Sequence, residues 1–220
     1  MIQAKGIVKI YHGKCIIDSL DLSCDKNTTT WITGPSGAGK TTLLGILSGL
    51  ITPDSGMIIQ SGKIVNSKKH GIKPALRELG YVFQSAGLWP HMNVSEQVGY
   101  ALYRLSKTER ENRVFQLLES LGIVALAARY PHEISGGEAR RVSMARMLAH
   151  NPKLLLMDEP FANVDDETRI SISSFLSDWQ KKNEVTIIAV THRMDDIKNM
   201  PGTVYKMVNG KLEAREMMAG

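Results

Sequence analysis

The sequence predicts an α/β fold in which a small antiparallel sheet precedes the core and a helical lobe is inserted into it. Residues 153–158 and 185–191 are almost continuously apolar, which is typical of parallel strands that are buried on both faces. Residues 2–24 alternate and are rich in Ile, Val and Leu, which predicts an antiparallel strand pair that is broken near His12. From about residue 85 to 149 helical periodicity replaces these strand patterns, and this change predicts the inserted lobe.

The remaining elements are each predicted by a local pattern. β-Branched and aromatic residues at 28–33 predict a strand, and the apolar run at 43–47 predicts a buried helix that opens at Gly39 or Lys40. After this helix we expect two short strands at 57–59 and 63–65, a polar loop at 66–74 and a buried strand at 79–83. The lobe helices are expected to carry inward faces formed by Val94, Val98, Leu102 and Leu105 and by Val114, Leu117, Leu118 and Leu121, and a helix after Glu138 is expected to turn Val142, Ala145 and Leu148 inward. A helix at 166–181 and a closing hairpin around Asn209 and Gly210 complete the prediction.

Composition and charge are those of an ordinary globular protein. With 43% hydrophobic and 22% charged residues, we expect residues 1–220 to form a single domain that includes the lobe at about 85–149. The net charge of +5 is a mild, scattered excess that would suit a nucleic acid or an anionic membrane surface, but it favours a solvated surface, and we expect no nucleic-acid partner. No apolar run has membrane-spanning length and Met1 does not open a signal peptide, so we expect a cytoplasmic protein that reaches a membrane only through a partner. Cys15 and Cys24 are expected to be buried thiols.

A glycine-rich loop is the strongest chemical motif in the sequence. Residues 33–42 read Thr-Gly-Pro-Ser-Gly-Ala-Gly-Lys-Thr-Thr and match G-x-x-x-x-G-K-[ST] between an expected strand and an expected helix. In such a loop, backbone N–H groups and the helix N-terminus bind a phosphate chain. Lys40 would reach the β- and γ-phosphates and the Thr41 hydroxyl would bind Mg²⁺. The alternative is a glycine turn that matches by chance, and the flanking strand and helix argue against it.

Polar side chains follow the other predicted core strands where ligands of open α/β sheets bind, beyond the carboxyl ends. Asp158 ends a buried strand, where a carboxylate needs a cation, and we expect it to hold Mg²⁺ with Thr41. Glu159 would orient or deprotonate a water in line with the γ-phosphate. For this acid pair, the alternative role is to cap the next turn. Gln84 would bind Mg²⁺ or its water through the amide oxygen.

Three further residues or segments have a functional and a structural interpretation. His192 would donate a hydrogen bond to a γ-phosphate oxygen, or it is a structural histidine. Tyr11 would stack on a nucleotide base, or it is an aromatic residue of an edge strand. Residues 135–137, Ser-Gly-Gly, would form a second anion site at a helix start, or they are a plain helix start. Because this segment lies across the lobe, we expect it to meet the nucleotide of a second chain packed head to tail.

Together these motifs resemble the ATP-binding subunit of ABC transporters over essentially the whole chain. The resemblance implies a P-loop NTPase core with an N-terminal antiparallel β-subdomain and an inserted helical lobe, ATP and Mg²⁺ as ligands, and an ATPase reaction. It assigns Lys40, Glu159 and His192 to catalysis and Thr41, Gln84 and Asp158 to the metal. It assigns the following residues to ATP: Tyr11, the Walker A residues Gly34, Pro35, Ser36, Gly37, Ala38, Gly39, Lys40, Thr41 and Thr42, the Q-loop residue Gln84, the signature residues Ser135, Gly136, Gly137 and Glu138, and the D-loop residue Asp165.

The chain departs from the family pattern at a few positions. Glu138 stands where the signature usually has glutamine, near the partner's ribose, and a carboxylate can still accept a hydroxyl hydrogen bond there. Residues 162–165, Ala-Asn-Val-Asp, replace the usual Ser-Ala-Leu-Asp, and Ile134 replaces leucine. Residues 84–98 are similar to the segment that docks the transmembrane subunit in importer ATPases, where phenylalanine is commoner than Trp89. The chain ends at Gly220, so we expect it to lack the C-terminal regulatory domain of many sugar importers.

The resemblance implies an ATPase subunit that dimerises on ATP and drives import through a separate membrane permease. A second copy of the subunit and the permease are the expected partners, and an extracytoplasmic solute-binding protein would act through the permease. The alternatives are the same engine driving export or lipid and lipoprotein release, a soluble ATPase that acts on nucleic acid, and a non-catalytic nucleotide-binding module. The presence of both Glu159 and His192 argues against the non-catalytic module.

Overall fold

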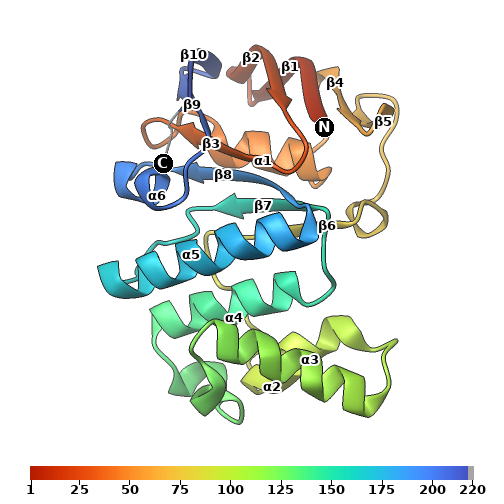
Figure 1. Cartoon of the computed structure of the whole chain (residues 1–220). Helices are drawn as coiled ribbons and strands as arrows, with labels where there is room; N and C mark the ends of the chain where they lie inside the picture. The colour runs from red at the N-terminus through yellow and green to blue at the C-terminus, as the bar shows by residue number, and fades with distance from the viewer. Residues whose placement is uncertain (218–220) are drawn as a thin grey trace.

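A computed structural model describes residues 1–217 and contains two sheets (Figure 1). The first sheet is antiparallel and has the strand order β2-β1-β4-β5. Alternation at the start of β1 places Ile2 and Ala4 on its inner face, and an irregularity in the pairing between Ala4 and Ile7 brings Ile7 into the same buried cluster. The strands are β1 (Ile2–Tyr11), β2 (Lys14–Cys24), β4 (Ser55–Gln60) and β5 (Lys63–Ser67).

The second sheet forms the core and has the order β10-β9-β3-β8-β7-β6. Strands β9, β3, β8, β7 and β6 run parallel, and β10 pairs antiparallel with β9 through the turn at Asn209 and Gly210. Every residue of β7 and β8 is buried, as the continuous apolar runs predict. The strands are β3 (Thr29–Thr33), β6 (Leu79–Val82), β7 (Leu154–Asp158), β8 (Thr186–Thr191), β9 (Thr203–Val208) and β10 (Lys211–Met217).

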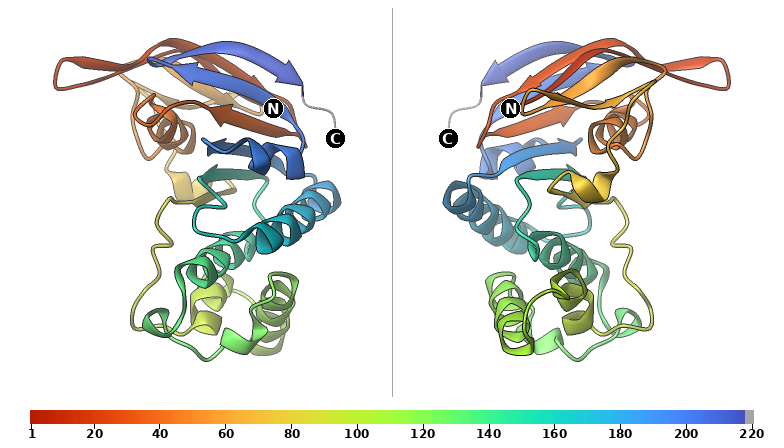
Figure 2. Two further views of the ribbon diagram at one scale, coloured as in Figure 1. Left: turned by 90° about the vertical axis from the view of Figure 1, so that its left-hand side faces the viewer. Right: turned by 90° about the vertical axis from the view of Figure 1, so that its right-hand side faces the viewer.

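Helices separate the layers of the molecule. In Figure 1, α1 (Lys40–Ser48) lies between the two sheets, and α5 (Asp166–Asn183) and α4 (Gly136–Leu148) cover the opposite face of the core sheet. Both views in Figure 2 place α2 (Val94–Gly99) and α3 (Lys107–Ser120) at the end of the molecule remote from the antiparallel sheet. The short helices are η1 (Pro74–Leu76), η2 (Tyr100–Leu102), η3 (Val124–Leu126), η4 (Pro131–Glu133) and α6 (Met194–Asn199).

Two buried apolar clusters follow from these layers. One lies between the two sheets around α1 and contains Ile32, Leu43 and Ile188. The other joins the far face of the core sheet to the lobe and contains Val142, Leu155 and Leu176. Because α4 contributes to this second cluster and also contacts β6, the lobe is packed directly onto the core sheet.

The predicted elements are present, and several details differ from the expectation. Residues 85–93 enter the lobe without helix, because α2 begins only where the Asn93 side chain caps it. Leu105 is exposed, since it lies between η2 and α3 rather than on a helix. The predicted loop at 66–74 begins inside β5, where buried Asn66 donates to the carbonyls of Ile46 and Ile51. Cys15 is exposed, contrary to the expectation, and Cys24 is buried.

Candidate nucleotide site

The glycine-rich loop at residues 34–42, the predicted phosphate-binding loop, leads from β3 into α1 and depends on glycine at two positions. Gly34 has φ 148°, and a Cβ there would lie 2.1 Å from the carbonyl oxygen of Met207. Gly39 has φ 104° and precedes the first residue of α1. Lys40 is buried, and its Nζ donates to the carbonyl oxygens of Gly34 at 2.7 Å and Pro35 at 2.9 Å. The lysine ammonium is therefore held over the loop, at the N-terminus of the helix, where an anion would bind.

The loop borders a cavity of about 600 Å³ that we call the main cavity. It lies at the carboxyl ends of β3, β6, β7 and β8, where α/β sheets bind ligands. Gly34, Pro35 and Ala38 are not among its lining residues; Gly34 and Pro35 supply carbonyls to Lys40, and Ala38 is buried. Its lining residues are Tyr11, Ile16, Ser36, Gly37, Gly39, Lys40, Thr41, Thr42, Gln84, Asp158, Glu159, Ala162 and His192.

Asp158 is the most buried acid of the main cavity, with 2% of its surface exposed. Burial raises the pKa of its carboxyl group, whereas a hydrogen bond with Thr41 and the positive charges of Arg140 and Lys40 lower it. A buried carboxylate beside a hydroxyl and an amide, those of Thr41 and Gln84, is an all-oxygen donor set. This set fits Mg²⁺, which proteins hold with one or two carboxylates together with phosphate oxygens and water. Within residues 1–217 there is no group of three or more His, Cys, Asp or Glu side chains placed to hold a metal ion, so phosphate oxygens and water would have to complete this donor set.

Glu159 and His192 both line the main cavity, and their side chains contact each other. His192 Nδ1 lies 2.9 Å from Glu159 Oε1, and the histidine is 65% exposed whereas the glutamate is 13% exposed. Glu159 has φ 49°, which is uncommon for a residue other than glycine. Its N–H donates to the carbonyl of Val190 at 3.0 Å, so the left-handed conformation is fixed by the neighbouring strand β8. The arrangement holds one carboxylate at the cavity surface, oriented by an imidazole.

The signature segment, residues 134–138, lies outside the main cavity of its own chain. Ser135 caps α4, its Oγ accepts from the N–H of Glu138 at 3.3 Å, and Glu138 Oε2 accepts from the N–H of Ser135 at 2.7 Å. That second bond lowers the pKa of Glu138, so its carboxylate is charged at neutral pH. A Cβ on Gly137 would lie 3.1 Å from the carbonyl of Asn163, so the segment adjoins residues 162–165. Asp165 caps α5 by accepting from the N–H of Thr168 at 2.9 Å.

Arg140 was not predicted as a site residue, yet its side chain contacts the backbone of residues that line the main cavity. It is 3% exposed and donates to the main-chain carbonyls of Phe83 and Gln84, which follow β6, and of residues 158–160 at the end of β7. The available signal was a charged residue within a helix that also contains Val142, Met144 and Ala145. A helix that is buried on most sides must provide a partner for each charge it carries. Ile16 and Ala162 also line the main cavity without having been predicted to do so.

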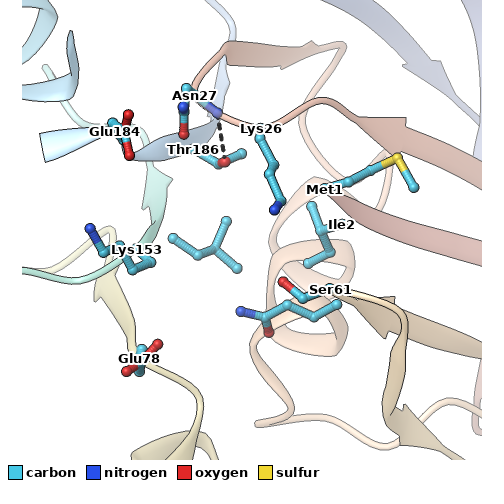
Figure 3. Close-up of a pocket in the computed structure, with 11 residues that line it drawn as sticks. Met1, Ile2, Lys26, Asn27, Ser61, Glu78, Lys153, Glu184 and Thr186 are labelled. Atoms are coloured by element: carbon cyan, nitrogen blue, oxygen red, sulfur yellow. Dashed lines mark hydrogen bonds between the residues drawn. The ribbon is translucent and has the colours of Figure 1, made fainter.

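A second cavity, of about 420 Å³, lies at the amino ends of the core strands (Figure 3). Ile2, Lys26 and Ser61 line it from one side, and Glu78, Lys153 and Glu184 line it from the other (Figure 3). Charges of both signs surround this space. Since ligands of α/β sheets bind at the carboxyl ends of the strands, the main cavity is the candidate nucleotide site.

A groove of about 1160 Å³ crosses the lobe between α2 and α3. Tyr100, Tyr103 and Phe115 line it, and they are 59%, 69% and 51% exposed, respectively. These three exposed aromatic side chains form an apolar patch in the groove, and exposed apolar patches are typical of interaction surfaces. His91, Met92, Ser95 and Glu96, which lie in the predicted docking segment 84–98, line the same groove.

The fold and the main cavity define a nucleotide-binding cassette, and comparison with known proteins identifies its family. The sequence pattern of the ABC transporter family matches residues 17–162, and the chain belongs to this family.

Curated relatives include a sulfate/thiosulfate import ATP-binding protein from Rhodopseudomonas palustris, CysA, which is 37% identical over 96% of this chain and 62% of its own length. Another is an Fe(3+) ions import ATP-binding protein from Pasteurella multocida, FbpC, which is 38% identical over 94% of this chain and 59% of its own length. The chain thus spans about 60% of the length of these relatives.

A solved structure has a closely similar fold. It is the dimeric structure of a post-hydrolysis state of an ATP-binding cassette bound to ADP and Pi, with a TM-score of 0.90 and 26% identity over the full length of both chains. None of the helices within residues 1–217 combines the length and apolarity that a bilayer crossing requires.

Proposed function

We propose that this protein is an ATPase subunit that dimerises on ATP and drives import of a solute through a separate membrane permease. The observation that carries the proposal is the convergence of Lys40, Asp158, Glu159 and His192 on one cavity at the end of a phosphate-binding loop. Family membership and the relatives, which are import ATP-binding proteins, support the same function.

In this proposal the phosphate-binding loop holds the triphosphate. The Lys40 ammonium exchanges its bonds to the carbonyls of Gly34 and Pro35 for bonds to the β- and γ-phosphate oxygens. Backbone N–H groups at 36–42 supply further donors at the helix N-terminus. Tyr11, which lines the same cavity and is 40% exposed, supplies a ring face for the adenine.

Hydrolysis is assigned to the pair of Glu159 and His192. The Glu159 carboxylate accepts a proton from the attacking water, and the imidazole at 2.9 Å orients that carboxylate. Because a carboxylate only accepts, Nδ1 of His192 donates to Glu159, and the exposed Nε2 would donate to a γ-phosphate oxygen when the ring is in its protonated imidazolium form. Thr41, Asp158 and Gln84 would hold Mg²⁺, which when bound neutralises charge on the β- and γ-phosphates. Lys40 stabilises the same developing charge.

The second nucleotide contact is assigned to the signature segment of a partner copy. Its N–H groups at 136 and 137 lie in the first turn of α4, a helix of 13 residues, and the segment does not line the main cavity of its own chain. The γ-phosphate of ATP bound to the partner is an anion that the N–H groups of Gly136 and Gly137 would bind, and Asp165 at the start of α5 would lie at the same interface as an acceptor. Two identical chains packed head to tail would make two such composite sites.

The permease is assigned to the groove between α2 and α3 and to the adjoining segment 84–98. Exposed Tyr100, Tyr103 and Phe115 provide apolar contact area. Gln84 begins this segment and lines the main cavity, so closure around nucleotide would move the segment that meets the permease. Contact with the permease would hold this subunit at the inner face of the cell membrane, and a solute-binding protein would deliver the cargo from outside.

Phosphate release by the purified full chain tests the ATPase assignment. We expect hydrolysis with Mg²⁺, loss of hydrolysis with EDTA, and loss of turnover in Glu159→Gln with ATP binding retained, because the amide keeps the shape but cannot accept the proton. Glu119→Gln is the matched control, since Glu119 is exposed on α3 outside the main cavity. Equal single-turnover rates in Glu159→Gln and the parent chain would remove Glu159 from its assigned role.

A further inference from the structure

Arg140 is a buried cation at the junction of three segments that the nucleotide site uses. It lies on α4, four residues after Gly136, and is 3% exposed. Its guanidinium donates to the carbonyls of Gln84 at 3.1 Å and Pro160 at 3.0 Å. It also donates to the carbonyls of Phe83, Asp158 and Glu159. One side chain thus joins the end of β6, the end of β7 and the start of the signature helix.

The carbonyls gathered around Arg140 need a positive charge. Three consecutive peptide groups, 158–160, direct their oxygens at one point, and their dipoles repel one another unless a cation lies between them. The middle residue, Glu159, has φ 49°, an unfavourable backbone conformation that is kept only where surrounding contacts hold it in place. Burial lowers the pKa of Arg140 to about 10, opposed by the Asp158 and Glu159 carboxylates, so the guanidinium is still charged at neutral pH.

Arg140 also connects this backbone to the signature segment. From Gly136 to Arg140 is about one helical turn, roughly 6 Å along the axis of α4. A hydrogen-bonded helical turn is stiff, so a displacement of the signature segment moves the guanidinium, and with it the main chain of Gln84 and Glu159. Gln84 and Glu159 both line the main cavity, whereas the signature segment lies outside it.

We propose that Arg140 is a positioning residue that couples the two composite ATP sites of the dimer. When the signature segment of one chain binds the partner's nucleotide, Arg140 fixes Glu159 and Gln84 of its own chain for hydrolysis. ATP in one site thereby promotes turnover in the other. This inference rests on the proposed function and adds a route by which the two sites communicate.

Arg146 on the same helix is a matched control. It is also a buried arginine, 7% exposed, and it donates to the carbonyls of Ala86 at 3.2 Å and Gly87 at 3.0 Å. Its guanidinium lies 4.6 Å from the ring centre of Trp89. The Arg146 contacts do not include the carbonyls at 158–160. Removing Arg146 therefore removes a buried cation from α4 without releasing the Glu159 backbone.

The test is an ATP titration of steady-state hydrolysis by the full chain, Arg140→Met, Arg140→Lys and Arg146→Met. For the parent chain we expect a Hill coefficient approaching ~2, the number of sites. In Arg140→Met the maximal rate should fall by roughly tenfold to a hundredfold and the Hill coefficient should approach ~1, because a displaced carboxylate loses its geometry. Affinity of the monomer for a fluorescent ATP analogue should stay within about twofold of the parent value, since the phosphate-binding loop is intact.

The lysine variant separates positioning from stability. Arg140→Lys keeps the buried cation, but an ammonium is a point charge and cannot span carbonyls of both loops as a planar fork does. We expect it to fold, to bind the analogue normally and still to lose cooperativity. If Arg140→Met does not fold, the Hill coefficient of Arg140→Lys therefore still tests whether Arg140 couples the two sites. Arg146→Met should keep the parent Hill coefficient.

Three results would overturn the coupling while leaving the proposed function in place. The first is a parent-like rate and Hill coefficient in Arg140→Lys, or in a folded Arg140→Met. The second is a parent chain that hydrolyses ATP without cooperativity. The third is an equal loss of cooperativity in Arg146→Met. A parent chain that binds no ATP and hydrolyses none would overturn the proposed function itself, and the coupling with it.

Discussion

Replacing Arg169 by methionine is expected to destabilise the protein by about 3–5 kcal/mol, because it leaves a buried carboxylate without its cation. Arg169 on α5 and Asp196 on α6 have side chains that are 3% and 2% exposed, with 3.4 Å between Nε and Oδ1. Asp196 keeps one donor, the Thr191 hydroxyl at 2.5 Å. Arg169 also holds Asp166 at 2.6 Å and the carbonyl of Val164, so its loss releases several partners.

A double-mutant cycle isolates the ion pair from these other contacts. In the Asp196→Asn background no buried negative charge is left behind, so Arg169→Met should cost less there, by about 0.5–3 kcal/mol. Urea unfolding at pH 7 is the assay. With a slope of about 2 kcal/mol/M, the single Arg169→Met change should lower the midpoint by roughly 1.5–2.5 M.

An exposed pair on α6 provides the control for this cycle. Lys198 Nζ lies 3.0 Å from Asp195 Oδ1, closer than the atoms of the buried pair, but the side chains are 70% and 58% exposed. We therefore expect Lys198→Met to leave the unfolding midpoint unchanged, because water already solvates both charges. If Arg169→Met cost no more stability than Lys198→Met, or if Asp196→Asn left its cost unchanged, the buried ion pair would not contribute to stability as described.

Three further predictions concern binding, turnover and pH. Lys40→Ala should lose most ATP binding in calorimetry, and parent-like affinity would contradict the role of the loop. Glu159→Gln should lower single-turnover hydrolysis by about 10²–10⁴-fold, the usual contribution of a general base, while keeping ATP affinity. Burial raises the pKa of Asp196 in the folded chain, and the Thr191 hydroxyl and the Arg169 charge partly offset this shift. The stability that this raised pKa contributes is therefore complete below the unfolded-state pKa of Asp196, and it is lost as pH rises through the folded-state pKa. The stability of Asp196→Asn relative to the parent should therefore increase from pH 4 to 7 in urea unfolding, and a flat or falling difference would contradict the direction of the shift.

Much of the fold could be predicted from the sequence because its strands and turns have strong local patterns. The apolar runs at β7 and β8 and the loop at 34–42 are specified by adjacent residues, and the structure contains them. Helix α6 was not predicted, since six residues including two adjacent aspartates carry no helical period, and tertiary burial of Asp196 and Ile197 fixes it instead. Leu105 was misplaced because a continuous period was assumed across the break between η2 and α3.

The candidate site divides in the same way. Residues at strand ends, such as Gln84 and His192, could be predicted to converge because parallel strands end at one edge, and the structure places both on the main cavity. The pairing of Glu159 with His192 was not predicted, because the two residues follow different strands, β7 and β8, and sequence spacing does not indicate which of their side chains come into contact. The contacts of Arg140 are with carbonyls, which every residue carries, so their convergence is visible only in three dimensions.

Light scattering on the hydrolysis-deficient Glu159→Gln chain, with ATP and with ADP, tests ATP-dependent dimerisation. We expect a dimer with ATP and a monomer with ADP, because only the γ-phosphate spans the two surfaces and shifts the equilibrium by its differential affinity. Adding Ser135→Arg should abolish the ATP dimer while ATP still binds the monomer, since the residue 34–42 loop is unchanged. A Ser135→Arg/Glu159→Gln chain that still dimerises with ATP would contradict the claim that the signature segment binds the partner's nucleotide.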